Sequence, residues 1–171
     1  MKERVYLIGF MGVGKTTQGK KLARLLGYHF VDLDDFFETK FKIEIHQFFN
    51  KYDEPLFRRL ENDRLKKTFE MKKVVVATGG GTPCHHNGIE NINRHGISVF
   101  LEMPPAVIAD RLMHAKRKRP LVEGKSGKEL TQYIKEKLSE RLSCYQKAMI
   151  KVDALHLDIA ALAGEIKDFK R

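Results

Sequence analysis

The sequence predicts a single α/β domain in which helices cover a parallel β-sheet. Five short apolar segments alternate with stretches of helical periodicity along the 171 residues, which is the pattern of a sheet with helical connections. One of these segments is the unbroken valine run at residues 74–76, as expected for a strand that is buried on both faces. A chain of this length is long enough for one hydrophobic core and short for two, so residues 1–171 are expected to form one domain.

Strand and helix signals follow one another along the chain. The first strand is expected at residues 5–8, where a β-favouring run ends at Gly9. A helical pattern then begins at Thr16 and stops at Gly27. Four further strands are expected, at residues 28–31, 74–77, 97–101 and 150–157. Ligands of such sheets bind at the carboxyl ends of the strands, so the residues that follow these segments are candidates for function.

Two segments differ in composition from this scaffold. Residues 35–70 are rich in aromatic and charged side chains, which predicts helices that pack through their aromatics and form a substrate-binding lobe. Residues 111–126 are strongly basic, contain Pro120 and Gly124, and lose the apolar period after Met113. We expect this second segment to be a mobile flap.

A phosphate-binding loop is the clearest motif. Residues 9–16, GFMGVGKT, match G-x-x-x-x-G-K-[ST] between an expected strand and an expected helix. Its glycines let backbone N–H groups converge on phosphate oxygens, and the helix amino terminus adds partial positive charge. Lys15 would reach the β- and γ-phosphates, and Thr16 would offer its hydroxyl to Mg²⁺. The loop predicts ATP or GTP binding; the alternative is a glycine-rich turn with a surface lysine.

Asp32 and Asp34 follow the second expected strand, separated by Leu33. The alternation of the strand is expected to extend through Asp34, so both carboxylates would point the same way, toward the phosphate loop. One carboxylate could then hold hydrated Mg²⁺ while the other accepts the hydroxyl proton of a phosphoryl acceptor. The alternative is that Asp34 or Asp35 only caps the next helix.

Three consecutive glycines, residues 79–81, follow the third expected strand. They would allow the backbone to approach a ligand closely, whereas the alternative is a flexible turn that needs glycine only for its backbone angles. Cys84, His85 and His86 come next. Adjacent residues do not form a tetrahedral cage and no second Cys/His cluster complements them, so we assign no structural zinc.

Composition restricts partners and location. A net charge of +10, from 32 Lys and Arg against 22 Asp and Glu, favours anionic partners without choosing among nucleic acids, membranes and phosphorylated metabolites. No apolar run reaches the roughly 18 residues of a membrane span, so a soluble protein is expected. The two cysteines, Cys84 and Cys144, are too few for a disulfide framework and predict a cytoplasmic location.

The basic run at residues 116–119 has three interpretations. It could bind nucleic acid, form an ordinary solvated surface, or close over a nucleotide. It contains no aromatic side chain that could stack on bases, so nucleic-acid binding has no support there. An arginine from a closing flap would stabilise charge on the transferred phosphoryl group.

Six motifs together resemble the shikimate kinase family in order and spacing. They are GFMGVGKTT at 9–17, DLD at 32–34, FRRLE at 57–61, ATGGG at 77–81, RPL at 119–121, and Arg141 with Tyr145. The phosphate loop alone is shared by many unrelated NTPases, whereas the rest of the set is specific to this family. The resemblance implies a three-layer α/β/α fold of the P-loop NTPase type with a five-stranded parallel sheet. It also implies a substrate-binding lobe at about residues 33–62 and a lid at about residues 112–127.

The activity implied by this resemblance is ATP-dependent phosphorylation of the 3-hydroxyl of shikimate to shikimate 3-phosphate, in chorismate and aromatic amino acid biosynthesis. ATP and Mg²⁺ are then required, and no nucleic acid or membrane partner is expected. A monomer is expected, because a small enzyme with a complete site needs no partner chain.

Roles for individual residues follow from the same resemblance. Lys15, Asp34 and Arg119 are implied as catalytic. Nucleotide contacts are implied for Gly12, Val13, Gly14, Lys15, Thr16, Thr17, Arg111 and Arg119, and Mg²⁺ contacts for Thr16 and Asp32. Shikimate contacts are implied for Asp34, Arg58, Gly80, Gly81 and Arg141, with the two arginines facing its carboxylate. One departure is that Asp53-Glu54 stands where the family usually has Gly-Glu.

Other functions remain open at this level. A related small-molecule kinase, such as a gluconate kinase, would use the same loop, although the combination of FRRLE and GGG favours shikimate. An inactive phosphate-loop module that holds nucleic acid through its charge would have no need of an intact Lys15, Thr16 and Asp34. Arg58 and Arg141 could instead form surface salt bridges, with Glu61 and Glu140 as partners.

Overall fold

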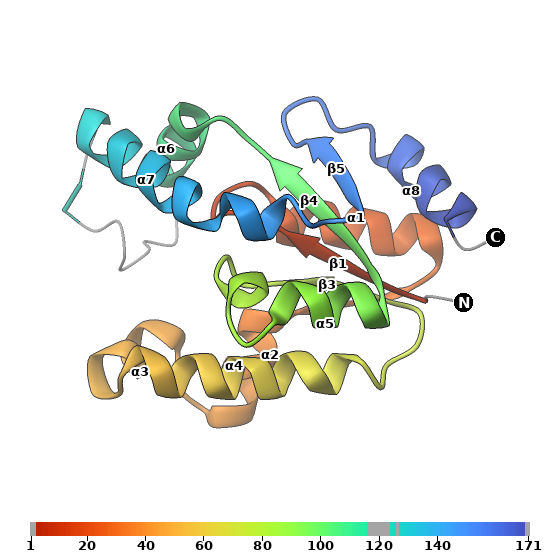
Figure 1. The fold of residues 1–171 in the computed structure, drawn as a ribbon, viewed down its shortest axis with the longest axis horizontal. Coiled ribbons are helices and arrows are strands. Elements are labelled where there is room, and N and C mark those ends of the chain that lie inside the picture. Colours follow the sequence, from red (N-terminus) through yellow and green to blue (C-terminus); the bar gives the residue numbers. More distant parts are fainter. Residues whose placement is uncertain (1–2, 116–123, 126, 170–171) are drawn as a thin grey trace.

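A five-stranded parallel sheet with strand order β2-β3-β1-β4-β5 forms the centre of the computed structural model, which describes residues 3–115, 124–125 and 127–169 (Figure 1). The strands are β1 (Arg4–Ile8), β2 (His29–Asp32), β3 (Val74–Ala77), β4 (Ile97–Glu102) and β5 (Ile150–Asp153). Every neighbouring pair is parallel. The α/β fold with a five-stranded parallel sheet is therefore confirmed.

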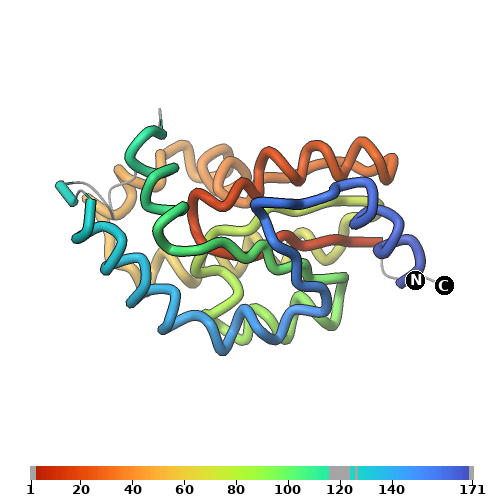
Figure 2. Tube along the Cα trace, turned by 90° about the horizontal axis from the view of Figure 1, so that it is seen from above, coloured from red at the N-terminus to blue at the C-terminus, as the bar shows by residue number. Residues whose placement is uncertain are grey.

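Helices cover both faces of the sheet. They are α1 (Lys15–Leu26), α2 (Leu33–Phe41), α3 (Ile45–Lys51), α4 (Glu54–Thr68), α5 (Gly88–His95), α6 (Pro105–Met113), α7 (Gly127–Tyr145) and α8 (Ile159–Asp168), with a short 3₁₀ helix, η1 (Thr82–Cys84). Seen from above, α1 lies on one side of the sheet, and α5 and α7 lie on the other (Figure 2). This is the three-layer arrangement that the sequence resemblance implied.

The core follows the two-residue period of the strands. In β1, Val5 and Leu7 pack into a cluster shared with α1 and α8, while Tyr6 and Ile8 pack into a second cluster shared with α4, α5 and α7. All four side chains are fully buried. A central parallel strand buried on both faces reads as a continuous apolar run, as β1 and the valines of β3 do.

Strand order determines where the loops meet. β1, β2 and β3 lie side by side, and Leu7, Asp32 and Ala77 are paired in register near their carboxyl ends. The segments that follow these strands, residues 9–16, 33–35 and 78–81, therefore begin at the same edge of the sheet. This edge is where a ligand of an open parallel sheet is expected.

The lobe expected from aromatic residues is built by α2, α3 and α4. Phe37, Phe48 and Phe57, one from each helix, form a small buried cluster with ring centroids 5.0 to 5.9 Å apart. The lobe boundaries at 33 and 62 stay a prediction, and α4 continues to Thr68. The predicted flap and lid fall largely on residues 116–123 and 126, which lie outside the described residues.

The last strand is shorter than expected. β5 ends at Asp153 and does not continue to residue 157, because the Asp153 Oδ1 accepts a hydrogen bond from the Leu155 N–H over 2.8 Å. An Asp side chain that bonds its own backbone two residues on forms a turn and ends the strand. Within the described residues, no helix combines the length and the apolar character required to cross a membrane.

Candidate active site

The phosphate-binding loop joins β1 to α1 in a conformation that requires glycine. Gly12 and Gly14 have φ angles of 82° and 97°, in the left-handed region that residues with a Cβ rarely adopt. At Gly9, with φ 137°, a Cβ would lie 2.8 Å from the Leu101 carbonyl oxygen. The glycines at these positions therefore allow the loop to turn tightly over the end of the sheet.

Lys15 lies inside this loop. Its side chain is buried, and the Nζ donates to the carbonyl oxygens of Gly9 at 2.8 Å and Phe10 at 2.7 Å. These bonds hold the ammonium group against the loop, on one side of the cavity described next. Val13 differs from its neighbours because its side chain packs into the core, which leaves only its backbone for a ligand.

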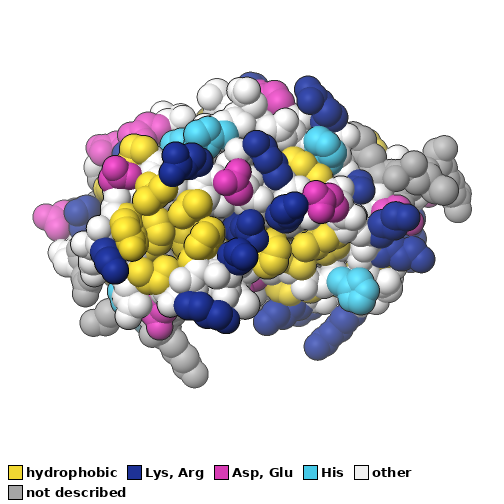
Figure 3. All heavy atoms as spheres, turned by 90° about the horizontal axis from the view of Figure 1, so that it is seen from below, with side chains coloured by type: hydrophobic (Ala, Val, Ile, Leu, Met, Phe, Trp, Pro, Cys, Tyr) yellow, Lys and Arg dark blue, Asp and Glu magenta, His cyan; other side chains and the backbone are white. Residues whose placement is uncertain are grey.

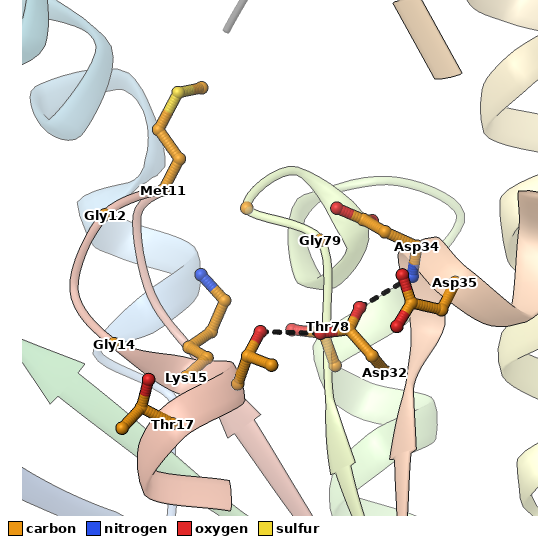
Figure 4. A pocket seen from close by; sticks show the side chains of 12 residues that line it. Met11, Gly12, Gly14, Lys15, Thr17, Asp32, Asp34, Asp35, Thr78 and Gly79 are labelled. Atoms are coloured by element: carbon orange, nitrogen blue, oxygen red, sulfur yellow. Dashed lines mark hydrogen bonds between the residues drawn. The ribbon is translucent and has the colours of Figure 1, made fainter. Parts of the chain in front are cut away.

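A cavity of about 390 Å³, here called the loop cavity, lies in front of the loop (Figure 4). Its lining residues are Met11, Gly12, Gly14, Lys15, Thr16, Thr17, Asp32, Asp34, Asp35, Thr78, Gly79 and Gly80. Most of the residues that the sequence associates with a nucleotide and a metal are thus brought together. In Figure 4 the loop and Lys15 lie across the cavity from Asp34 and Asp35, with Gly79 between them.

Asp32 is the link between β2 and α2. Its Oδ2 accepts from the Thr16 Oγ1 at 2.6 Å, and its Oδ1 accepts from the Asp34 N–H at 3.1 Å (Figure 4). Asp32 is therefore the N-cap of α2. The prediction that the strand continues through Asp34 was wrong: the cap starts the helix at Leu33, and Asp34 lies in its first turn. The alternative that named Asp34 or Asp35 as the cap was also wrong.

Thr16 and Asp32 have the chemistry of a Mg²⁺ site. The Thr16 hydroxyl gives its proton to Asp32, which leaves its oxygen lone pairs available to a cation. In the described part of the chain, no three His, Cys, Asp or Glu side chains form a metal cluster. Mg²⁺ bound with a nucleotide needs no such cluster, because it keeps waters and takes phosphate oxygens. The two residues therefore fit this metal.

A second cavity of about 100 Å³, here called the arginine cavity, adjoins the first. Its lining residues are Met11, Asp34, Ile45, Phe49, Phe57, Arg58, Glu61, Gly79, Gly80, Gly81 and Arg141. Arg58 comes from α4 and Arg141 from α7, so two distant segments supply cationic side chains to one small space. Asp34 lines both cavities and lies where they join.

Arg58 is held by two carboxylates. Its Nη1 donates to the Glu61 Oε2 at 2.9 Å, and its Nε and Nη2 donate to the Glu54 Oε1 at 3.1 and 3.0 Å. Burial acts to lower the pKa of Arg58, but the ion pairs with Glu61 and Glu54 outweigh it and raise the pKa. The surface salt-bridge alternative predicted Glu61 correctly as a partner, but Arg58 and Glu61 are both buried.

The three glycines after β3 make room for charged side chains. A Cβ on Gly79 would lie 2.7 Å from the Glu61 Oε1, and a Cβ on Gly81 would lie 2.6 Å from both terminal nitrogens of Arg58. None of the three glycines has a positive φ. The interpretation as a turn that needs glycine only for its backbone angles was therefore wrong, because close approach is what excludes larger residues.

Arg141 reaches the site from α7. Its guanidinium lies over the Phe10 ring, 5.5 Å from the centroid, and its Nη1 is 3.3 Å from the position of a Cβ on Gly80. Glu140, the alternative salt-bridge partner, pairs instead with Lys137 at 2.9 Å. Among the described residues, Arg141 makes no salt bridge.

Two further arginines, Arg111 and Arg119, were predicted to contact the nucleotide. The Arg111 Nη1 comes within 3.9 Å of the position of a Cβ on Gly14, so this arginine adjoins the phosphate loop. Arg119 lies outside the described residues, and its role stays a prediction.

Cys84 makes a thiol hydrogen bond with Cys144, which lowers the pKa of Cys84 and raises that of Cys144. Burial, with a contribution from Arg58, lowers the pKa of His85.

Several lining residues were not singled out from the sequence. They are Met11, Ile45, Phe49, Phe57 and Thr78. Met11, Phe57 and Thr78 lie inside motifs that had been recognised, so neighbouring motif positions were a usable signal. Ile45 and Phe49 come from α3, which carried no motif, and only the packing of the lobe places them here.

Comparison with known proteins gives one family. A family model described as shikimate kinase matches residues 11–169. The shikimate kinase of Phocaeicola vulgatus is 46% identical over 154 residues, which cover 89% of this chain and 88% of that protein. The crystal structure of shikimate kinase from Bacteroides thetaiotaomicron has a TM-score of 0.90 at 37% identity, covering 98% and 97% of the two chains. The enzyme from Acinetobacter baumannii, solved in complex with shikimate, has a TM-score of 0.84 at 32% identity, covering 98% and 92%.

Proposed function

The chain belongs to the shikimate kinase family, and from this premise we propose that it transfers the γ-phosphoryl group of ATP to the 3-hydroxyl of shikimate. The products are shikimate 3-phosphate and ADP, within chorismate and aromatic amino acid biosynthesis. The observation that carries this proposal is the position of Asp34 at the junction of the loop cavity and the arginine cavity. A carboxylate at that junction lies between a phosphate donor and a carboxylated acceptor.

The nucleotide occupies the loop cavity in this proposal. The backbone N–H groups of residues 12–17 and the amino terminus of α1 receive the phosphates. Lys15 turns its ammonium group from the loop carbonyls toward the β- and γ-phosphates. Arg111 contacts the adenine ring of the nucleotide. Thr16 and Asp32 would hold Mg²⁺, which would supply positive charge to offset that of the phosphates.

The acceptor occupies the arginine cavity. Arg58 and Arg141 bind its carboxylate, and Asp34 with the backbone of Gly80 binds its hydroxyls. Asp34 accepts the proton of the 3-hydroxyl as that oxygen forms its bond to the γ-phosphorus. The bond between that phosphorus and the bridging oxygen of ATP breaks in line, and ADP leaves with the bonding electron pair.

Three further assignments are part of the proposal. Arg119 stabilises charge on the transferred phosphoryl group, as expected from the RPL motif. The enzyme acts as a monomer, because a small enzyme with a complete site needs no partner chain. It acts in the cytoplasm, the location that its low cysteine content favours.

The two competing functions have less support. A gluconate kinase also takes a carboxylated acceptor, so the two arginines do not separate gluconate from shikimate, and it is the combination of the FRRLE and GGG motifs that favours shikimate. A nucleic-acid module would be favoured by a continuous basic stripe. On the face seen in Figure 3, Lys and Arg side chains are instead spread out with acidic and hydrophobic side chains between them.

A coupled ADP-release assay tests the proposal. The acceptor panel is shikimate, quinate, gluconate, AMP and UMP, each with and without Mg²⁺. We expect Mg²⁺-dependent turnover with shikimate and little turnover with AMP or UMP, because the arginine cavity has no pocket that could recognise a nucleobase. Faster turnover with gluconate, AMP or UMP than with shikimate would refute the assignment.

A further inference from the structure

Thr82, the first residue of η1, lies behind the arginine cavity and is not among the residues that line it. Its side chain is buried, and its Oγ1 donates to the Glu61 Oε1 at 2.6 Å. The backbone N–H of Thr82 donates to the Gly79 carbonyl at 3.2 Å, which closes the turn after the glycines. The Thr82 hydroxyl is therefore held in place as a hydrogen-bond donor to the buried Glu61 carboxylate.

Glu61 divides its two oxygens between two partners. The Oε1 accepts from Thr82, and the Oε2 accepts from the Arg58 Nη1 at 2.9 Å. Glu61 thus contacts Arg58 through one oxygen, although a carboxylate and a guanidinium commonly form two parallel bonds. The Thr82 hydroxyl occupies the oxygen that would make the second bond.

This arrangement decides which N–H groups of Arg58 remain available. A guanidinium has five N–H donors, and the three bonds from Arg58 to Glu54 and Glu61 use one on each nitrogen. Among the described residues, the remaining donors, one on Nη1 and one on Nη2, make no bond. Each of these two donors can bond an oxygen of a ligand carboxylate.

We propose that Thr82 is a positioning residue for acceptor recognition, which keeps Glu61 bound through one oxygen and so leaves Arg58 two donors for the carboxylate of the acceptor. Without the hydroxyl, the Glu61 Oε1 would be a buried charged acceptor lacking a donor, a costly state. Glu61 would then take a second bond from Arg58, in competition with the acceptor. This inference rests on the proposed function, because it concerns the same cavity.

The test compares Thr82→Val, which removes the hydroxyl at nearly constant shape, with Thr82→Ser, which keeps it. We expect the valine variant to raise KM for shikimate roughly tenfold, the scale of one hydrogen bond to a charged group. We expect kcat and KM for ATP to stay within about twofold, because Thr82 touches neither the nucleotide nor the reacting atoms. The serine variant should restore KM to within about twofold of the parent enzyme.

A matched control is Thr68→Val. Thr68 is also fully buried on α4, but its hydroxyl bonds to the Leu65 carbonyl at 2.6 Å and to the Tyr6 hydroxyl at 3.0 Å, away from the cavities. It should lower the melting temperature and leave KM unchanged. If Thr82→Val does not fold, Thr82→Cys replaces it, because a thiol is a weak donor and should also raise KM.

The methyl ester of shikimate separates this effect from a general disturbance of the site. The ester weakens the contact with Arg58, so the loss from Thr82→Val and the loss from the ester should not add. An unchanged KM in the valine or cysteine variant, an equal rise in Thr68→Val, or additive losses would overturn the inference. A parent enzyme that does not phosphorylate shikimate would instead refute the proposed function.

Discussion

The phenolic hydroxyl of Tyr145 donates a hydrogen bond to the carbonyl oxygen of Gly80 over 2.6 Å. Tyr145 is fully buried at the end of α7, one turn after Arg141, and Gly80 lines both cavities. Burial raises the pKa of Tyr145, so the hydroxyl stays protonated and remains a donor throughout the neutral range. The bond ties the helix that carries Arg141 to the loop between the two cavities.

Tyr145→Phe should therefore affect stability and acceptor binding together. The half-buried Gly80 carbonyl loses its donor, which should cost about 1 kcal/mol and lower the melting temperature by roughly 2 to 4 °C. KM for shikimate should rise several-fold because Arg141 is less firmly placed. Tyr6→Phe is the control, since it removes a buried hydroxyl bonded to Thr68 and should lower stability alone. An unchanged KM in Tyr145→Phe would contradict the link to Arg141.

Asp34→Asn should lower kcat by about 100-fold or more, the usual range for a positioned general base. The amide keeps the size of the side chain but cannot accept the hydroxyl proton. Asp35→Asn is the matched control, because Asp35 lines the loop cavity but not the arginine cavity, and its kcat should change little. A normal kcat with only a raised KM in Asp34→Asn would show that Asp34 binds the acceptor without serving as a base.

Lys15→Ala should abolish phosphoryl transfer and leave the protein folded. The Nζ bonds two carbonyls of a polar loop, and the apolar core does not depend on it. Circular dichroism and the melting curve check the fold, and the coupled assay checks the activity. Retained turnover would exclude Lys15 from charge stabilisation at the transferred phosphoryl group.

Local sequence was sufficient to predict the parts of the site in which the backbone contacts the ligand. The phosphate loop could be predicted because the positive φ angles of Gly12 and Gly14 and the strand and helix around them are all encoded within one segment. The valine run of β3 was placed at its observed limits for a similar reason. The position of Asp34 could not be predicted in this way, because an apolar Leu33 fits both a continuing strand and the first turn of a helix. The deciding bond, from the Asp34 N–H to Asp32, is not visible in an alternating pattern.

Tertiary contacts explain the features that sequence patterns missed. For residues 79–81 the sequence left open close approach to a ligand and a flexible turn, and the structure shows that glycine is needed there for the space taken by Arg58 and Glu61. Those side chains come from α4, about twenty residues earlier in the chain. Thr82 likewise gave no signal of its own, since its partner is known only once α4 packs beside η1.

Asp53→Ala should destabilise the fold without changing catalysis. Asp53 is the N-cap of α4, and its Oδ1 accepts from the Leu56 N–H at 2.9 Å. Loss of such a cap costs about 1 kcal/mol, whereas glycine, the usual residue of the family here, should cost only a few tenths of a kcal/mol. Asp158→Ala removes the equivalent cap of α8 and provides a comparison. Chemical denaturation measures the loss; a raised KM for shikimate would contradict a purely capping role.

The two arginines should respond differently to replacement by lysine. Arg58 makes three hydrogen bonds to Glu54 and Glu61 in a buried setting, whereas Arg141 forms no salt bridge within the described residues and stacks on Phe10. A lysine offers a point charge without the planar fork. Arg58→Lys should therefore lower both the melting temperature and kcat/KM, while Arg141→Lys should lower kcat/KM with little change in stability.

Both lysine variants should lose about 2 to 4 kcal/mol in kcat/KM for shikimate, the scale expected when one partner of a desolvated charge pair is impaired. KM for ATP should stay unchanged, because neither arginine lines the loop cavity. The methyl ester of shikimate should lose nearly as much with the parent enzyme, and the ester and Arg141→Lys should not add, since both weaken the same contact. If the acid and the ester are phosphorylated equally well, or if Arg141→Lys handles shikimate normally, the two arginines do not bind a carboxylate and the acceptor must be of another chemical class.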